Sequence, residues 1–318
     1  MIRAGLLLAL LLAAGPAAGE RLQLASWNLE WLMTPATFDA LAGHCTTTRP
    51  VRNDQRSLPC DLVPRGRWST ADFRRLAAFA AAAAPDVVAL QEVDGPPAAK
   101  LVFPAHDFCF TRRRHVQNVG FAIRRGIPYR CNADYRTLAP RGSGVRYGAD
   151  LTLYPGTAQE IRLLAVHLKS GCPAGSLAAA REACNILQRQ VPALEGWIDR
   201  RAQERARFAV VGDFNRHLAR ETAPARDRSG RVLALWPEID DGDPPGAELL
   251  NAAAPADRAT CGTRHDQRPA VDHILLGRGL APALVTGSFR VWPYPEAGRW
   301  PDHCLISVEL EPETRHGL

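Results

Sequence analysis

Short apolar runs recur along the chain, each bounded by polar residues, glycine or proline. Their length and their content of Val, Ile, Leu and Ala are typical of β-strands. The runs that predict strands span residues 22–27, 86–90, 120–123, 149–154, 161–166, 208–211, 270–276 and 304–310. After Asp86, the run at 86–90 is continuously apolar, so we expect this strand to be covered on both faces.

Two longer stretches have the 3.6-residue periodicity of helices. Ser69 and Asp72 form a capping-box pattern ahead of an apolar stripe, and Pro85 ends that helix. Residues 177–206 predict the longest helix, with its apolar side chains on one side and a kink at Pro192. Strands mixed with two long helices predict an α/β or α+β fold.

Two other stretches predict loops. Residues 34–67 contain several prolines and two cysteines, which is typical of a long loop held by a disulfide. Residues 236–257 are acidic and rich in proline, and we expect a loop whose role the pattern leaves open. Because no repeat, linker or charged block divides the chain, we expect a single domain at residues 20–318.

The first residues have a pattern of their own. Arg3 precedes an apolar run at 4–14, and Pro16 and small residues follow it. This predicts a secretory signal peptide at residues 1–19. A membrane anchor is the alternative, but the apolar run is too short to span a bilayer. We therefore expect a secreted or periplasmic protein without a transmembrane segment.

Composition and charge narrow the choice of partner. With 46% hydrophobic and 23% charged residues, the chain has the composition of a globular protein. The formal net charge is +6, and loss of Arg3 with the signal peptide lowers it by one. A basic exported protein attracts polyanions, either nucleic acid or anionic lipid surfaces. Nearly all of this charge is arginine, because lysine occurs only at Lys100 and Lys169.

Eight cysteines in an exported chain indicate disulfides. A zinc site is the alternative, but the chain has no CxxC pair and no Cys/His cluster at ligand spacing. Proximity in the sequence favours the pairs Cys45 with Cys60, Cys109 with Cys131, and Cys172 with Cys184, which leaves Cys261 with Cys304.

The strand predicted at 208–211 ends in a polar motif. Gly212 allows a tight turn, and Asp213 and Asn215 follow it. Two side chains two residues apart on an extended segment point the same way. A carboxylate beside a carboxamide at a strand end can orient water, hydrogen-bond a phosphate oxygen or hold a hard cation. The alternative is an Asx turn that only closes the strand.

An acid, amide or histidine stands at the end of six of the predicted strands. These residues are Asn28, Glu92, His167, Asp213 with Asn215, Asp272 with His273, and Asp302 with His303. Such strand ends can converge on one edge of a sheet sandwich, where ligands bind. The repetition favours one functional site over a set of unrelated turns.

The ordered series N, QE, HLKS, GDFN, DHILL and PDH resembles the endonuclease/exonuclease/phosphatase superfamily. That group includes deoxyribonuclease I, apurinic endonucleases, bacterial sphingomyelinases and inositol polyphosphate phosphatases. The resemblance covers about residues 22–311. It implies a four-layered αββα sandwich, in which two mixed sheets lie face to face with helices outside.

The resemblance also implies a divalent-metal site. Glu92 corresponds to the principal metal ligand, assisted by Asn28 and Asp302. Oxygen ligands without cysteine suit Mg²⁺, with Mn²⁺ or Ca²⁺ as alternatives.

The same resemblance implies catalytic roles. His303, oriented by Asp272, corresponds to a histidine that polarises water or steadies the phosphate. Asp213 would align the nucleophile, and Asn215 would hold a phosphate oxygen. His167 would lie near the leaving oxygen, as an acid or a phosphate donor. A cation and several donors are needed because a phosphodiester's own charge repels a nucleophile. The identity of the general base stays open.

Three more residues are candidates for binding phosphate. Lys169 follows His167 closely in a chain poor in lysine. Arg146 and Tyr147 lie in the glycine-rich loop at 141–148.

The other basic residues have simpler interpretations. The arginines at 112–114 follow a nucleic-acid backbone or form a solvated loop, and the pattern does not choose between the two. His273 lies inside a predicted strand, and we interpret it as structural. Histidines that lie in loops without partners are expected to be solvated: His44, His106, His115, His217 and His265.

The sequence therefore predicts an exported, monomeric, divalent-metal-dependent phosphodiesterase, most simply an endonuclease that hydrolyses DNA or RNA. A lipid phosphodiesterase of the sphingomyelinase type and a polyphosphate phosphatase are alternatives. Basic charge favours nucleic acid, and no long aromatic-rich hairpin for membrane insertion is present. A non-catalytic nucleic-acid-binding protein on the same scaffold is the alternative from another class.

Overall fold

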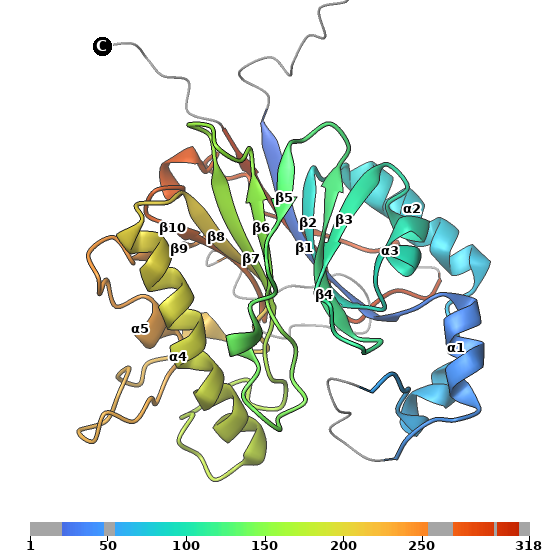
Figure 1. Ribbon diagram of the computed structural model, residues 1–318, viewed down its shortest axis with the longest axis horizontal. Helices are drawn as coiled ribbons and strands as arrows, with labels where there is room; N and C mark the ends of the chain where they lie inside the picture. Colours follow the sequence, from blue (N-terminus) through green and yellow to red (C-terminus); the bar gives the residue numbers. More distant parts are fainter. Residues whose placement is uncertain (1–20, 48–54, 254–269, 296–297, 312–318) are drawn as a thin grey trace, which may run out of the picture.

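Two six-stranded mixed sheets face each other in the computed structural model, which describes residues 21–47, 55–253, 270–295 and 298–311 (Figure 1). The first sheet has the strand order β11-β12-β1-β2-β4-β3. Its strands are β1 (Leu22–Leu32), β2 (Val87–Val93), β3 (His106–Phe110), β4 (Asn118–Arg124), β11 (Arg290–Trp292) and β12 (Leu305–Leu310). Buried apolar side chains from both sheets form one cluster between them, which makes the sandwich core.

The second sheet has the order β5-β6-β7-β8-β10-β9. Its strands are β5 (Tyr129–Cys131), β6 (Ala149–Leu153), β7 (Ile161–His167), β8 (Phe208–Asp213), β9 (Leu249–Asn251) and β10 (Asp272–Gly277). One neighbouring pair in each sheet is parallel, β1 with β2 and β7 with β8, and the other pairs are antiparallel.

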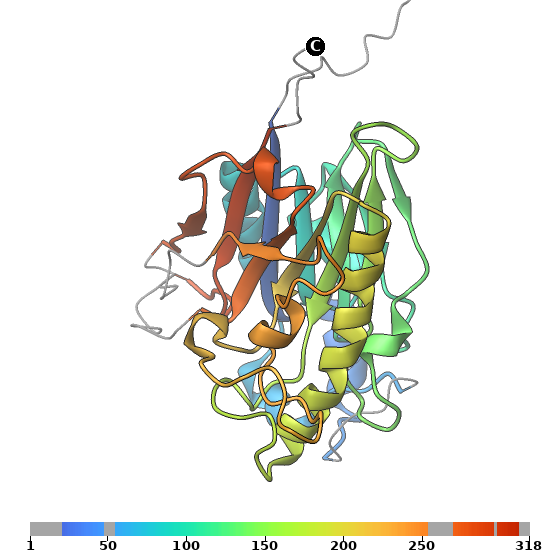
Figure 2. The same cartoon turned by 90° about the vertical axis from the view of Figure 1, so that its left-hand side faces the viewer.

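Helices cover the outer faces of the sandwich. A parallel pair needs a crossover, and each of the two crossovers contains a long helix: α2 (Thr70–Ala83) and α4 (Glu182–Gln203). The short helices α3 (Pro96–Val102) and α5 (Trp236–Ile239) lie beside them (Figure 1). Seen from the side, α4 runs along the outer face of the second sheet (Figure 2). This is the predicted αββα sandwich.

Local contacts set the ends of α2, and a contact with a distant segment sets the start of α4. Ser69 caps α2 through the predicted capping box with Asp72, and the helix ends at a left-handed Ala84 before Pro85. Helix α4 begins later than predicted, at Glu182 instead of residue 177, and ends at Gln203. The preceding residues form a loop instead, because the Leu177 amide donates to a distant strand-like segment at Leu233.

The stretch at 34–67 is more regular than predicted. Thr34 caps a helix, α1 (Pro35–Ala42), and the 3₁₀ helix η1 (Cys60–Arg65) follows. Proline at the first helical position favours α1, because its fixed φ suits a helix start. The segment at 236–257, expected as a loop of open role, contains the short helix α5 and the strand β9 in its described part, residues 236–253.

Three of the predicted disulfides are formed, Cys45–Cys60, Cys109–Cys131 and Cys172–Cys184. The fourth predicted pair includes Cys261, which lies outside the described residues, as do the signal peptide at 1–19 and His265. Within the described ranges, no helix is long and apolar enough to cross a bilayer.

Candidate active site

The register of the second sheet places three predicted residues in one row. His167 at the end of β7 pairs with Asp213 at the end of β8, and Asp213 pairs with Asp272 at the start of β10. Strand β1 faces β8 across the sandwich and brings Asn28 to the same place. The strand ends that carry polar residues therefore do converge.

The carboxylate of Asp213 is the centre of this group, and its residue is 1% exposed. Asn28 Nδ2 donates to its Oδ2 at 3.1 Å, and Asn215 donates from its backbone at 2.7 Å and from Nδ2 at 3.0 Å. His167 Nε2 lies 3.3 Å from Oδ2, and His303 Nε2 lies 3.8 Å from it. The Asp213–Asn215 contacts form a local turn. Asp213 also has partners from three other segments, Asn28, His167 and His303, so the turn is part of a larger group.

The two histidines at Asp213 differ in charge. Burial lowers the pKa of His167 well below its ordinary value, so this imidazole is neutral near pH 7. Burial also lowers the pKa of His303, but the negative charges of Asp272 and Asp213 outweigh it and raise this pKa well above its ordinary value. His303 Nδ1 lies 2.8 Å from Asp272 Oδ2, which orients the ring. Burial raises the pKa of Asp213 to about 7, although the positive charge of His303 opposes this.

Glu92 lies next to this group, one residue before the end of strand β2. Its Oε2 accepts from the Trp31 amide at 3.2 Å, and its Oε1 is 3.4 Å from Asn28 Nδ2 and 3.7 Å from His167 Nε2. The pairing of β1 and β2 is irregular here, as is that of β2 and β4. Bulges of this kind turn a side chain away from its regular direction, and they are frequent beside active sites.

Four non-glycine residues at the site have left-handed backbone angles. Their φ values are 45° at Glu30, 55° at Trp31, 59° at Glu92 and 51° at Asn215. Such conformations are unfavourable for residues with a Cβ, and they persist where the surrounding structure imposes them. The backbone therefore holds these side chains in directions that a relaxed strand would not give.

Glu30 is a residue that the sequence analysis missed. Burial raises its pKa, and the charges of Asp302 and Glu92 act in the same direction, so the three carboxylates are near one another. Clustered carboxylates are the hard oxygen donors that Mg²⁺, Mn²⁺ and Ca²⁺ prefer, and their mutual repulsion is relieved when a cation binds. The donor set therefore fits a divalent cation. The sequence does contain a signal for this residue, because Glu30 is an acid only two residues after Asn28.

Asp213, Asp272 and His303 also bring ligand atoms within 4.8 Å of one another. In this second group His303 Nδ1 already shares a hydrogen bond with Asp272, so a cation there would displace a proton. The carboxylates around Glu92 are the more suitable ligand set for this reason.

Most of these groups line one cleft of about 510 Å³, whereas Asn28, Glu30 and Asp272 are not part of its wall. Its wall includes the predicted residues Glu92, Arg146, His167, Lys169, Asp213, Asn215, Asp302 and His303. Tyr147 is not part of the wall, and its ring lies between the guanidinium groups of Arg113 and Arg136, at 5.8 and 5.7 Å. Three further wall residues are Trp31, His115 and Gln117.

Several histidines differ from the predictions. His115 is 4% exposed instead of solvated. His106 lies in β3, with Nε2 3.0 Å from the Pro85 carbonyl, and His217 is half-buried. His44 is exposed, as predicted. His273 is buried, with Nε2 3.0 Å from the Arg216 carbonyl, which agrees with a structural role.

The arginine run at 112–114 divides between surface and interior. Arg112 and Arg114 are exposed, whereas Arg113 is buried. A solvated loop therefore describes only part of this run. The difference arises because backbone carbonyl groups inside the protein accept hydrogen bonds from Arg113.

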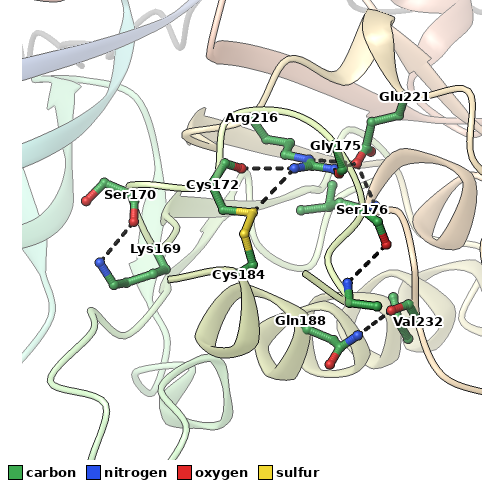
Figure 3. Close-up of a disulfide and its surroundings, with 12 residues drawn as sticks. Lys169, Ser170, Cys172, Gly175, Ser176, Cys184, Gln188, Arg216, Glu221 and Val232 are labelled. Atoms are coloured by element: carbon green, nitrogen blue, oxygen red, sulfur yellow. Dashed lines mark hydrogen bonds and ion pairs between the residues drawn. A yellow bond between two sulfur atoms is a disulfide. The ribbon is translucent and has the colours of Figure 1, made fainter. Parts of the chain in front are cut away.

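A disulfide and a buried arginine fix the loop that follows β7. The loop at 168–181 carries Lys169 and is joined to α4 by Cys172–Cys184 (Figure 3). Arg216 Nη1 donates to the Cys172 carbonyl at 2.9 Å, and Arg216 Nη2 donates to the Gly175 carbonyl. Arg216 directly follows Asn215, so the strand end and the loop are tied together.

The model of the Endonuclease/Exonuclease/phosphatase family matches residues 25–307. A comparison with the sequences of curated proteins found no match.

Solved structures show the same fold at low sequence identity. Danio rerio TDP2 complexed with a single-strand DNA product is 16% identical, with 91% of this chain and 98% of that chain covered and a TM-score of 0.52. A 3′-5′ exonuclease from Neisseria meningitidis is 14% identical, with 91% and 99% covered and a TM-score of 0.53. An AP endonuclease from Archaeoglobus fulgidus is 11% identical, with 91% and 99% covered and a TM-score of 0.55.

The family match covers nearly the whole described sandwich and includes each of the strand ends that meet at Asp213. The chain therefore belongs to the endonuclease/exonuclease/phosphatase family.

Proposed function

We propose that the chain is an exported endonuclease that hydrolyses phosphodiester bonds of DNA or RNA with water and a divalent metal ion. Membership of the family makes it a metal-dependent phosphodiester hydrolase. The observation that carries the proposal is the buried carboxylate of Asp213 between His167 and His303, in a cleft that also holds Glu92.

Glu92, Asn28 and Asp302 would hold Mg²⁺, with Mn²⁺ or Ca²⁺ as other ions of suitable chemistry. Glu30 lies near these acids, but Arg65 Nη1 pairs with its carboxylate at 2.7 Å, so it would contribute less. The ion, when bound, neutralises charge on the phosphate. Asn28 also donates to Asp213, so a shift of Asn28 on metal binding would change the position of the Asp213 carboxylate.

The protein's own residues divide the remaining work. Asp213 orients the attacking water, because Asn28 and Asn215 hold its carboxylate in one direction. His303, fixed by Asp272, donates to the phosphate where negative charge develops. Asn215 would donate to a phosphate oxygen with the Nδ2 hydrogen that the Leu168 carbonyl accepts at 3.2 Å in this structure, while its other Nδ2 hydrogen stays on Asp213.

His167 acts on the leaving-oxygen side. Its Nε2 lies between Asp213 and Glu92, at 3.3 and 3.7 Å. Its Nδ1 is buried without a hydrogen-bond partner among the described residues, so no carboxylate acts on the far side of the ring. His167 would donate to the departing oxygen from Nε2, giving up its contact with the Asp213 carboxylate to do so.

Nucleic acid is the favoured substrate for two reasons. The cleft wall contains the cations Arg146 and Lys169 in addition to the catalytic group, and the chain as a whole is basic. A structure of the same fold, TDP2, was solved with a single-strand DNA product. Tyr147 would act indirectly, by holding its neighbouring arginines.

The disulfides and the sequence at 1–19 support export, since disulfides persist mainly in oxidising compartments. We propose that the exported protein acts as a monomer, because the cleft groups named here come from one chain.

The test uses purified oxidised protein with Mg²⁺ on plasmid DNA, RNA, sphingomyelin and bis(p-nitrophenyl) phosphate, with a chelator as control. We expect cleavage of a nucleic acid that stops on chelation. Glu92→Gln should lower kcat by about 10² to 10⁴, whereas Glu248→Gln, at an exposed position, should not. Hydrolysis of sphingomyelin alone would favour the lipid alternative, and binding without cleavage the non-catalytic one.

A further inference from the structure

His115 presents one fixed hydrogen-bond donor to the cleft. It lies in the loop between β3 and β4 and is 4% exposed. The Gln117 amide donates to its Nδ1 at 2.9 Å, so Nδ1 is an acceptor and the ring proton is on Nε2. No described residue accepts a hydrogen bond from Nε2, while the residue lines the cleft. The donor therefore faces whatever occupies the cleft.

Arg146 brings a buried positive charge to the same wall. The residue is 9% exposed, and no described carboxylate forms an ion pair with it. Its Nη2 donates to the Leu168 carbonyl at 3.1 Å, and its Nε is buried without a partner. A buried cation without an anion is unfavourable, and a bound anion would relieve it.

Arg113 holds these two donors in place from behind. Its Nη1 donates to the Gln117 carbonyl at 2.8 Å, and its Nη2 donates to the Gly144 carbonyl at 3.3 Å. One guanidinium thus joins the loop that carries His115 to the turn that carries Arg146. The two donors form a single built site and are not independent surface groups.

The site is adjacent to the catalytic group but distinct from it. Asn215 Nδ2 and Arg146 Nη2 donate to the same carbonyl, that of Leu168, at 3.2 and 3.1 Å. The acids Glu92 and Asp302 line the same cleft and repel an anion, whereas the wall of His115 and Arg146 supplies donors. An anion beside the catalytic group is therefore attracted to the wall of His115 and Arg146.

We propose that His115 and Arg146 form a subsite for a second phosphate, next to the one that is cleaved. This rests on the proposed function, and it specifies the substrate as a chain with successive phosphates. Nucleic acids have such phosphates at every nucleotide, whereas a phosphodiester lipid headgroup has one. His115 acts here as a neutral donor and takes no part in proton transfer.

The test compares dinucleotides that differ only in a terminal phosphate. A dinucleoside monophosphate has one phosphodiester, and its 5′- or 3′-phosphorylated forms add a second phosphate on a known side. We expect one of the two phosphorylated forms to have a kcat/KM about 10- to 100-fold higher, as for hydrogen bonds to a charged group. His115→Phe should bring this ratio close to one, and His44→Phe, at an exposed position, should keep it.

The ratio is taken within each variant, so a general loss of activity does not affect it. A wild-type ratio near one for both phosphorylated forms overturns the subsite while the endonuclease proposal stands. That result needs no variant, so it decides the question even where His115→Phe does not fold. A ratio that survives in folded His115→Phe also overturns it. If the protein cleaves neither the dinucleotides nor longer DNA or RNA, the proposed function itself is overturned.

Discussion

Replacing Arg216 with methionine should destabilise the protein strongly, because it leaves a buried carboxylate without its cation. The side chains of Arg216 and Glu221 are 1% and 3% exposed, and Arg216 Nε donates to Glu221 Oε1 at 2.6 Å. Breaking a buried ion pair on one side costs about 3 to 5 kcal/mol. Two carbonyl groups, at Cys172 and Gly175, also lose a donor, which is part of this figure.

The double variant Arg216→Met/Glu221→Gln separates charge from packing. It removes the unpaired charge and keeps one acceptor oxygen. The amides of Leu235 and Trp236 donate to different oxygens of Glu221, so one of the two loses its acceptor. We expect it to be more stable than the single variant, with a remaining deficit of about 1 to 3 kcal/mol from the unpaired backbone groups. The regained part measures the electrostatic share of the damage in the single variant.

The assay is urea unfolding of the oxidised proteins, with kcat/KM measured on the same samples. Arg228→Met, at an exposed position, is the control and should change stability by less than about 0.5 kcal/mol. A loss below about 1 kcal/mol in Arg216→Met, or a double variant less stable than the single one, would refute the reasoning. A double variant that regains stability but not kcat/KM would show that Arg216 also positions Asn215 and the Lys169 loop.

Three more changes test separate parts of the structure. Asn215→Ala removes donors to Asp213 and to a phosphate, and kcat on bis(p-nitrophenyl) phosphate should fall about 10²- to 10³-fold; an unchanged kcat contradicts the role. Burial and the charge of Asp199 raise the pKa of Glu195 to about 9, so the folded protein keeps a proton there that the unfolded chain releases above about pH 4.5. Wild-type stability is therefore lost as pH rises from about 4.5 to about 9. Glu195→Gln should raise Tm at pH 8 and leave it unchanged at pH 4, and an equal effect at both would refute the assignment. Replacing both Cys172 and Cys184 with serine should lower the free energy of unfolding by about 3 kcal/mol, measured in urea, and an unchanged midpoint would contradict it.

Local signals in the sequence predicted the scaffold well. The capping box at Ser69 and the apolar runs depend on neighbouring residues, so the helix α2 and the central strands follow from the chain alone. The missed strands β3, β5, β9 and β11 have three to five residues each and lie at or near sheet edges, where alternation is too short to read. Their existence depends on the partner strand.

The sequence predicted some residues of the candidate site and missed others, because it shows local patterns but not the contacts between distant segments. Asp213 and its neighbours could be found because polar residues at strand ends form a pattern. His115 directly follows the three arginines at 112–114 and reads as part of a solvated loop, yet the carbonyl of Gly144, 31 residues away, accepts a hydrogen bond from Arg113 in the interior. Arg216 is similar, because the groups that bury it belong to other segments.

The left-handed backbone at Glu30, Trp31, Glu92 and Asn215 has a consequence for protein engineering. Each such residue costs about 1 to 3 kcal/mol relative to a relaxed conformation. Glycine adopts these angles without that cost, so selection for thermal tolerance alone would enrich glycine at these four positions. Heat-resistant variants found without an activity screen would therefore lose the cleft chemistry first and keep the sandwich intact.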